Sequence, residues 1–226
     1  MKTTVLIPFY NESATIEKIL SEILLQSLVT EIIMIDDGST DEGHQKAQLL
    51  GKNDSRIKIV RHSKNQGKGA AIRTGLLQAT GDFILIQDAD LEYNPNEYAA
   101  LLAPLWNNEA DVVYGSRFQG RESHHTPYFF NRIGNKVLTR LSNFRTGLQL
   151  TDIQTCFKVF RKEILQKITL CENRFGFDSE ITAKTAKTGA RILEVSVSYH
   201  GRTYAEGKKL LRWKDGWRSL YAILKY

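Results

Sequence analysis

The amino-acid sequence predicts an α/β protein with a mostly parallel sheet flanked by helices, and two observations support this. Short apolar runs typical of buried strands alternate with longer segments whose apolar residues recur at helical spacing. Polar clusters stand directly after three of the apolar runs. Because the carboxyl ends of parallel strands share one edge of a sheet, where ligands bind, we expect these clusters to form a binding site.

The first half of the chain has the more regular alternation. Its first helical segment is typical, because Ile16, Ile19, Leu20 and Ile23 share one face of a helix. The apolar runs on either side of this segment are too short for helices and suit strands. We expect strands at residues 4–8, 31–35, 57–60, 82–87 and 111–114, and helices at 14–25, 69–79 and 96–106, with a further helical stretch before residue 57.

The second half is less regular. We expect a mobile loop at residues 117–130. The spacing of apolar residues after it predicts helices at 129–141 and 179–187, strands at 156–160 and 191–198, and a helical tail from 208 to 226. No Pro- or Ser-rich linker and no internal repeat divides the chain. We therefore expect one domain, residues 1–226, that ends in a basic amphipathic helix.

The composition is that of a folded protein of a reducing compartment. Hydrophobic residues make up 42% and charged residues 25% of the 226 positions. The longest apolar runs fall far short of the roughly 20 residues that cross a bilayer, and the first residues do not form a signal peptide. The two cysteines exclude a disulfide framework and a CxxC metal site. We expect a cytoplasmic protein.

Positive charge is concentrated at the end of the chain. The formal net charge is +6, and the segment from His200 to Tyr226 contains seven basic and only two acidic residues. Such a tail suits nucleic acid, anionic lipid or a phosphorylated substrate, and composition does not choose among them. We expect no nucleic-acid partner, because the chain has no finger, no helix-turn-helix pattern and no aromatic–basic strands.

The strongest chemical signal is the acidic segment after the fourth predicted strand. Alternation along an extended segment would turn Asp88, Asp90 and Glu92 the same way. Carboxylate oxygens are the ligands that hard divalent cations prefer, and a partly filled shell leaves room for phosphate oxygens. The alternative is an acidic loop that caps the helix starting near Asn94.

Other polar segments also follow strands. Asp36-Asp37 ends the second strand, and Asn11-Glu12 follows the first, where helix capping is the competing explanation. The glycine-rich segment around Lys68 lacks the spacing of a phosphate-binding P-loop, so we interpret it as a helix start. Cys156 has no evident partner in the sequence and is interpreted as a small packed residue.

Seven segments, in this order, resemble the motifs of family 2 inverting glycosyltransferases of the GT-A fold. The most similar branch is that of the dolichol- or polyprenyl-phosphate mannosyl- and glucosyltransferases. The resemblance covers nearly the whole chain. The segments are residues 6–12 (LIPFYNE), 35–41 (IDDGSTD), 65–70 (NQGKGA), 88–90 (DAD), 115–117 (GSR), 151–155 (TDIQT) and 177–180 (FDSE).

The resemblance implies a role for each matching residue. The nucleoside of a nucleotide-sugar would be held by Pro8, Tyr10, Glu12, Ile35 and Asp37. The resemblance also assigns Mg²⁺ or Mn²⁺ binding to Asp88 and Asp90, with Glu92 near the metal and Ala89 against the nucleotide. It assigns phosphate contacts to Arg117, Arg202 and Lys208, and contact with the acceptor phosphate to Arg132.

The implied reaction is inverting transfer of a hexose from a nucleotide-sugar, GDP-mannose first, to a polyprenyl or dolichyl phosphate. Asp90, Arg117, Asp178, Arg202 and Lys208 would be the catalytic residues. Asp178 would be needed as a base only for a hydroxyl acceptor. Residues 1–115 would form a nucleotide-binding half, 116–200 an acceptor-binding half, and 201–226 a tail at the membrane surface.

Several alternatives stay open. The donor can be UDP-glucose, the acceptor can be a sugar hydroxyl, or the chain can be a nucleotide-sugar binder without activity. Many members of the family carry membrane spans, so contact with the cytoplasmic face of a membrane would depend here on the tail or on a membrane-protein partner. The apolar residues of the tail either enter the lipid interface or pack on the domain.

Overall fold

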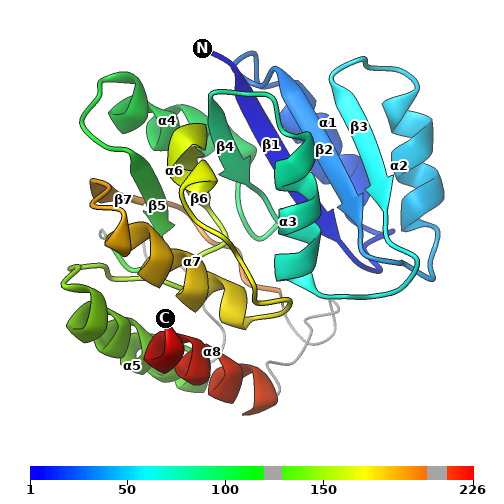
Figure 1. Ribbon diagram of the computed structural model, residues 1–226. Helices are drawn as coiled ribbons and strands as arrows, with labels where there is room; N and C mark the ends of the chain where they lie inside the picture. The colour runs from blue at the N-terminus through cyan, green and yellow to red at the C-terminus, as the bar shows by residue number, and fades with distance from the viewer. Residues whose placement is uncertain (120–128, 203–212) are drawn as a thin grey trace.

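The structure, a computed structural model, describes residues 1–119, 129–202 and 213–226 (Figure 1). Seven strands and a set of helices alternate through most of the chain. The strands are β1 (Thr3–Phe9), β2 (Glu31–Asp36), β3 (Ile57–Arg61), β4 (Phe83–Ile86), β5 (Val112–Ser116), β6 (Lys158–Arg161) and β7 (Ile192–Ser196). The helices are α1 (Ile16–Leu24), α2 (Gly43–Gly51), α3 (Lys68–Gln78), the 3-10 turn η1 (Pro95–Glu97), α4 (Tyr98–Trp106), α5 (Phe129–Thr146), α6 (Lys162–Gln166), α7 (Gly176–Lys187) and α8 (Trp213–Lys225).

One sheet contains all seven of these strands, in the order β3-β2-β1-β4-β6-β5-β7. The pairs among β3, β2, β1 and β4 are parallel, as is the pair of β5 with β7. Strand β6 is antiparallel to both of its neighbours. The predicted mostly parallel sheet is confirmed, and the reversed strand is a feature that local sequence patterns do not encode.

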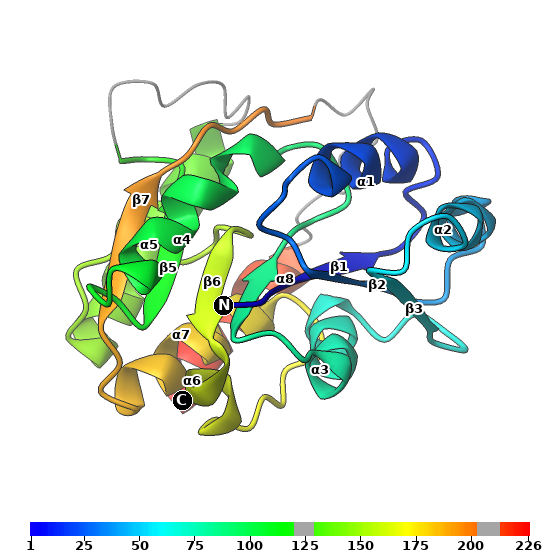
Figure 2. The same cartoon turned by 90° about the horizontal axis from the view of Figure 1, so that it is seen from above.

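Helices cover both faces of the sheet (Figure 2). Along β1, Val5 and Ile7 join the cluster that contains the buried residues of α1 and α4, whereas Leu6 joins the cluster that contains those of α3 and α7. This follows from the alternation of side chains along a strand. Both faces of the central strands are therefore buried, and a ligand can reach them only at their ends.

The second half differs from the prediction in where its helices begin and end. Helix α5 continues to Thr146, past the predicted end at residue 141. Helix α7 starts at Gly176, so Asp178 lies in its first turn rather than before it. The predicted loop 117–130 lies mostly outside the described residues, as does the first part of the predicted tail helix. Within the described part of the chain, no helix has the length and hydropathy needed to cross a membrane.

Candidate active site

The carboxyl ends of β1, β2 and β4 bring the motifs at residues 6–12, 35–41 and 88–90 together, because these strands are neighbours in the sheet. The Asp37 amide donates to the Phe9 carbonyl at 2.8 Å, and the Gln87 amide donates to the Leu6 carbonyl at 3.0 Å. The chain segments that follow the three strands thus leave the sheet side by side. Pro8 and Ala89 are buried at this edge, while Tyr10 and Glu12 are half-buried.

Asp88 is held by the start of helix α3. Lys68 Nζ lies 2.7 Å and 2.9 Å from the two carboxylate oxygens of Asp88, and the Cys156 thiol donates to the same carboxylate. Lys68 Nζ also lies 3.0 Å from Cys156 Sγ. Burial raises the pKa of Asp88, but the charge of Lys68 and the hydrogen bonds from Cys156 and Lys68 together outweigh it, and the pKa is lowered. Cys156 therefore has partners at the site, in contrast to the sequence-based interpretation.

Arg202 connects Glu12 with the acidic segment. Its Nη1 lies 3.0 Å from Glu12 and its Nη2 lies 3.1 Å from Asp90. The backbone amide of Arg202 donates to Glu92 at 3.0 Å. The Nε atom is buried and has no hydrogen-bond partner among the described residues. Nε does lie 3.7 Å from Glu92, at ion-pair distance, so all three nitrogens of this guanidinium face carboxylates.

The Asp90 carboxyl is in an environment that opposes its ionisation. Burial, and after it the charges of Asp88 and Glu92, raise the pKa of Asp90 to about 7 against the opposing effect of Arg202. A carboxyl pair that repels in this way is stabilised when a cation enters between its members. Asp88 and Asp90 thus fit the part of a divalent-cation shell that a protein supplies when phosphate oxygens and water complete it.

The three predicted metal ligands, Asp88, Asp90 and Glu92, do not point to one common position in the structure. Across the described ranges, no group of three His, Cys, Asp or Glu side chains is placed to hold a metal ion. Asp88 faces Lys68, Asp90 faces Arg202, and Glu92 accepts from the Tyr199 hydroxyl at 2.6 Å. Metal binding by Asp88, Asp90 and Glu92 stays a prediction.

Asp37 and Ile35, two of the residues predicted to hold a nucleoside, have side chains that are engaged within the protein. Asp37 accepts from the amides of Gln66 and Gly67 at 2.9 Å and 2.7 Å and contacts His62 Nδ1 at 2.7 Å. The side chain of Ile35 is fully buried in the core, so only its main chain can face a ligand. Asp37 therefore orders the turn before α3, and any contact with a nucleoside would be additional.

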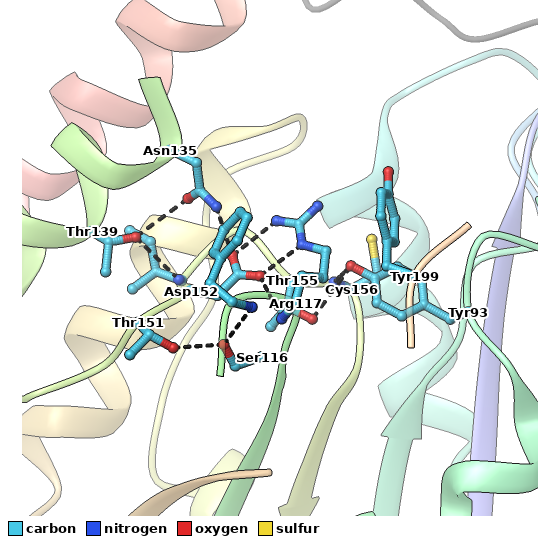
Figure 3. A network of polar contacts seen from close by, with 12 residues as sticks. Tyr93, Ser116, Arg117, Asn135, Thr139, Thr151, Asp152, Thr155, Cys156 and Tyr199 are labelled. Atoms are coloured by element: carbon cyan, nitrogen blue, oxygen red, sulfur yellow. Dashed lines mark hydrogen bonds and ion pairs between the residues drawn. The ribbon is translucent and has the colours of Figure 1, made fainter. Parts of the chain in front are cut away.

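Arg117, in the fifth predicted motif, is bound to a buried carboxylate of the sixth, residues 151–155 (Figure 3). Its Nε and Nη2 donate to the two oxygens of Asp152 at 2.7 Å and 2.8 Å, and Asn135 of α5 donates to the same carboxylate at 2.8 Å. Burial would raise the pKa of Asp152, but the charge and hydrogen bonds of Arg117 lower it. The paired Arg117 thus has less capacity for substrate phosphate than the sequence suggests.

Two tyrosines connect the Arg117 network to Asp88 and Glu92. The Tyr93 and Tyr199 rings meet edge to face at 5.2 Å, and the Arg117 guanidinium lies 5.1 Å from the Tyr199 ring centroid. The Tyr93 hydroxyl accepts from the Cys156 amide at 3.2 Å. Figure 3 shows both rings beside Cys156 at the end of this network. Neither tyrosine belongs to a recognised motif of the sequence, so their position beside the site becomes evident only from their contacts in the structure.

Asp178 is paired with a buried lysine. Lys158 of β6 is fully buried and donates to both the Asp178 carboxylate and the Thr155 carbonyl. The Asp178 carboxylate is therefore engaged with a buried ammonium group inside the protein. Lys158 was not a sequence candidate, since a lysine within an apolar strand carries no motif.

The remaining candidates lie away from this cluster or beyond the described residues. Arg132 is exposed near the start of α5, with its guanidinium 5.6 Å from the Phe118 ring centroid, and Arg117 lies 5.5 Å from the same ring. Lys208 lies outside the described residues. The structure therefore brings Glu12, Asp88, Asp90 and Arg202 together.

Comparison with known proteins agrees with this architecture. Residues 4–169 match the family model described as glycosyl transferase family 2. A dolichol-phosphate mannosyltransferase from Pyrococcus furiosus is 28% identical over 235 aligned positions, which cover 100% of this chain and 64% of that protein. The chain thus spans less than two thirds of the length of this curated relative.

Solved structures share the fold at low sequence identity. Glucosyl-3-phosphoglycerate synthase from Mycobacterium tuberculosis matches with a TM-score of 0.76 and 20% identity, over 99% of this chain and 79% of that one. A mannosyltransferase from Pyrobaculum calidifontis, in complex with GDP-mannose and Mn²⁺, matches with a TM-score of 0.63 and 21% identity, over 86% and 55% of the two chains. The predicted GT-A fold class is confirmed.

Proposed function

The chain belongs to glycosyl transferase family 2, and on this premise we propose that it transfers a hexose, with inversion, from a nucleotide-sugar to a polyprenyl or dolichyl phosphate. GDP-mannose is the first donor in this proposal, because the curated relative is a dolichol-phosphate mannosyltransferase and one solved neighbour is in complex with GDP-mannose.

The position of the Arg202 side chain is the observation that supports this proposal most directly. This side chain lies between Glu12, where the nucleoside is expected, and Asp90, where the metal is expected, and its Nε, 3.7 Å from Glu92, makes no hydrogen bond among the described residues. A diphosphate lies between the nucleoside and the sugar of the donor, so its oxygens would meet this guanidinium. Lys208 is the second cation of the proposed diphosphate contact.

Asp88 and Asp90 are the residues that would hold Mg²⁺ or Mn²⁺, with Glu92 as a further candidate. Neighbouring structures of the fold are in complex with Mn²⁺. When bound, such an ion supplies positive charge that stabilises the leaving diphosphate. The chain itself contributes Arg202 for the same charge, and the edge formed by Pro8, Tyr10 and Asp37 to orient the nucleoside.

The pairing of Asp178 with Lys158 favours a phosphate acceptor. A phosphate oxygen is already ionised at neutral pH, so it can attack the anomeric carbon while the bond from that carbon to the diphosphate oxygen breaks, and no base is needed. A hydroxyl acceptor would have to lose a proton, and the carboxylate nearest to that task is held by Lys158. Arg117 and Arg132, which flank Phe118, are the candidates for the acceptor phosphate.

A polyprenyl acceptor would place the protein at a membrane surface. In this proposal residues 1–115 bind the nucleotide-sugar, 116–200 bind the acceptor, and 201–226 approach the lipid, all within one domain. The cytoplasmic face is the expected location. UDP-glucose is the second donor to test, since solved neighbours include a glucosyltransferase in complex with UDP.

Transfer from a panel of radiolabelled GDP- and UDP-sugars to a short polyprenyl phosphate tests the proposal, with Mg²⁺, with Mn²⁺ and with EDTA. We expect metal-dependent label in the lipid extract from one donor. Asp90→Ala should reduce this transfer by about a thousandfold or more. Asp82, an exposed acid at the opposite end of β4, provides the matched control Asp82→Ala, which should retain activity. Label only on soluble sugars, or turnover retained in Asp90→Ala, would contradict the proposal.

A further inference from the structure

Helix α5 buries several polar side chains and leaves several large apolar side chains exposed, although Leu138 and Leu141 are half-buried and pack on the core. Asn135, Thr139 and Ser142 are buried. Val137 is 56% exposed and Phe144 is 86% exposed. With Ile133, also exposed, these apolar residues follow the spacing of one helix face, whereas surface helices of globular proteins normally bury such a face.

The buried polar side of α5 has a structural cause. Asn135 donates to Asp152 at 2.8 Å, and Asn143 exchanges hydrogen bonds of 2.7 Å and 3.1 Å with the backbone of Leu150. These contacts hold the segment that carries Asp152, the partner of Arg117. Much of the inward side of α5 is therefore committed to polar contacts with this segment, and Ile133, Val137 and Phe144 lie on the outer side.

Helix α8 adds a second exposed stripe beside the first. Trp217, Tyr221 and Leu224 are exposed at helical spacing, while Ser219 and Ile223 face the protein. Helices α5 and α8 contact each other and both contact α7, at one end of the molecule (Figure 1). We call the outward side of this helix pair the α5–α8 face; its apolar residues are Ile133, Val137, Phe144, Trp217, Tyr221 and Leu224.

The charges of the α5–α8 face are nearly all positive. Residues 129–146 contain four basic and no acidic residues, and residues 213–225 contain three basic residues and one acid. Arg218 is engaged with Glu172, but Lys136 and Arg140 are exposed on α5. A second copy of the chain would bring the same positive charge against this face, so self-association through it is opposed. An anionic surface is complementary in charge.

We propose that the α5–α8 face docks on an anionic lipid bilayer, with the apolar stripes in the interface and the basic side chains at the phosphates. The proposal rests on the proposed lipid-phosphate acceptor and extends it, because α5 rather than the tail alone is the docking element. Arg132 stands next to Ile133 at the start of the stripe, and its guanidinium and that of Arg117 flank Phe118. An acceptor phosphate held there would have its lipid chain at the docked face.

Flotation of the full chain with vesicles tests this docking. We expect binding to phosphatidylcholine vesicles that contain about one third phosphatidylglycerol, and weak binding to pure phosphatidylcholine. The double variant Val137→Ser/Phe144→Ser should lower the partition coefficient about tenfold or more. The control is Leu77→Ser, because Leu77 is 85% exposed on α3, outside this face. The control should bind like the wild type.

The charge component has its own pair of variants. Lys136→Glu/Arg140→Glu should lower binding to the anionic vesicles about tenfold, whereas Lys18→Glu/Lys52→Glu, on α1 and at the end of α2, should have a much smaller effect. Circular dichroism of each variant shows whether it is folded. Wild-type protein that does not bind protein-free anionic vesicles, or α5 variants that bind as well as the wild type, would overturn the proposal. A dimer in solution that Phe144→Ser dissociates would also overturn it, in favour of a second copy.

The experiments distinguish a failure of the docking proposal from a failure of the proposed transfer reaction. With a water-soluble short-chain prenyl phosphate, the α5 variants should transfer sugar at the wild-type rate, and with a long-chain acceptor in vesicles they should be about tenfold slower. Vesicle binding through α5 without transfer to any phosphate supports docking and rejects the proposed acceptor. Transfer to phosphate acceptors with no effect of the α5 variants in vesicles supports the acceptor and rejects docking.

Discussion

Helices α1 and α5 differ in the side chains that they bury. Helix α1 buries Ile16, Ile19, Leu20 and Ile23 against the sheet and exposes its charged residues. Helix α5 buries asparagine, threonine and serine side chains and exposes Val137 and Phe144. Both are helical and both are firmly part of the fold, so the direction of an apolar stripe alone does not tell which side of a helix faces the protein.

The difference follows from what each helix covers. The side chains of β1 and β2 beneath α1 are apolar, so apolar packing stabilises that helix. Helix α5 lies over the segment that carries Asp152, whose buried carboxylate requires hydrogen-bond donors. Apolar area therefore dominates the packing of α1, whereas a polar network with a charged pair is added to the apolar packing of α5. Four predictions test this contrast.

The largest effect on stability is expected from Asp152→Ala. This change leaves the Arg117 guanidinium, which is mostly buried, without its carboxylate, and removing one partner of a buried pair costs about 3 to 5 kcal/mol. Urea denaturation followed by circular dichroism measures the loss. Asp152→Asn keeps the shape and should cost less. A loss below about 1 kcal/mol in Asp152→Ala would show that the network does not stabilise the second region.

The apolar helix should show the ordinary cost of a cavity. Ile19 is fully buried in α1, and Ile19→Ala should lower the free energy of unfolding by about 2 to 4 kcal/mol. The same urea titration provides the value. Lys18→Ala, at the exposed neighbouring position, is the control and should change stability little. If Ile19→Ala proved neutral, the claim that α1 depends on apolar burial would be wrong.

A buried carboxylate in the first region should make stability depend on pH. Burial raises the pKa of Glu31, but Lys58, Thr4 and Thr80 outweigh it and lower the pKa to about 2. Because the folded pKa lies below the unfolded value, the contribution of Glu31 is complete above about pH 5 and is lost as the pH falls toward 2. Glu31→Gln should therefore be about 1 to 2 kcal/mol less stable than wild type at neutral pH.

The test of Glu31 is the pH dependence of this difference. Urea denaturation of both proteins near pH 7, pH 5 and pH 3.5 should show the difference shrinking at the lowest value. Thr30→Val, which alters a neighbouring exposed position, is a control that should not change the pH profile. A difference that stays constant to about pH 3.5 would assign the loss to packing rather than to ionisation.

The smallest effect on stability is expected on the outer side of α5. Val137→Ala and Phe144→Ala should change the free energy of unfolding by less than about 0.5 kcal/mol, because both side chains are exposed. Thermal and urea unfolding in the absence of lipid measure this. The comparison is with Ile19→Ala, which also truncates an apolar helical side chain. Destabilisation of similar size in both helices would mean that the outer side of α5 packs against the protein.

Local patterns predicted the first half of the molecule well. The alternation of short apolar runs and periodic segments corresponds to β1, α1, β2, β3, α3, β4, α4 and β5, since spacing within a segment reports which side of it is buried. The polar clusters that follow β1, β2 and β4 meet at one edge, as expected for neighbouring parallel strands. These features depend on residues close together in the sequence.

The candidate site could be predicted only in part. The acidic segment and Arg202 carry motif signals, and Asp90 and Arg202 are in contact as a shared site requires. The pairs Lys68–Asp88, Lys158–Asp178 and Arg117–Asp152 join residues at least 20 positions apart. No periodicity records which charge will meet which across such a separation.

The sequence by itself determined the fold class, the family and the types of residue at the ligand-binding edge. The spacing of apolar residues, the turn residues and the motifs can each be recognised from residues that are close together in the sequence. Only the tertiary structure decided that β6 runs antiparallel, that Asp178 is held by Lys158, and that α5 buries Asn135 and Thr139 while it exposes Val137 and Phe144. The physical reason is that a buried charge or polar group must find its partner wherever the fold brings one close. That partner is selected by the packing of distant segments, which local sequence does not specify.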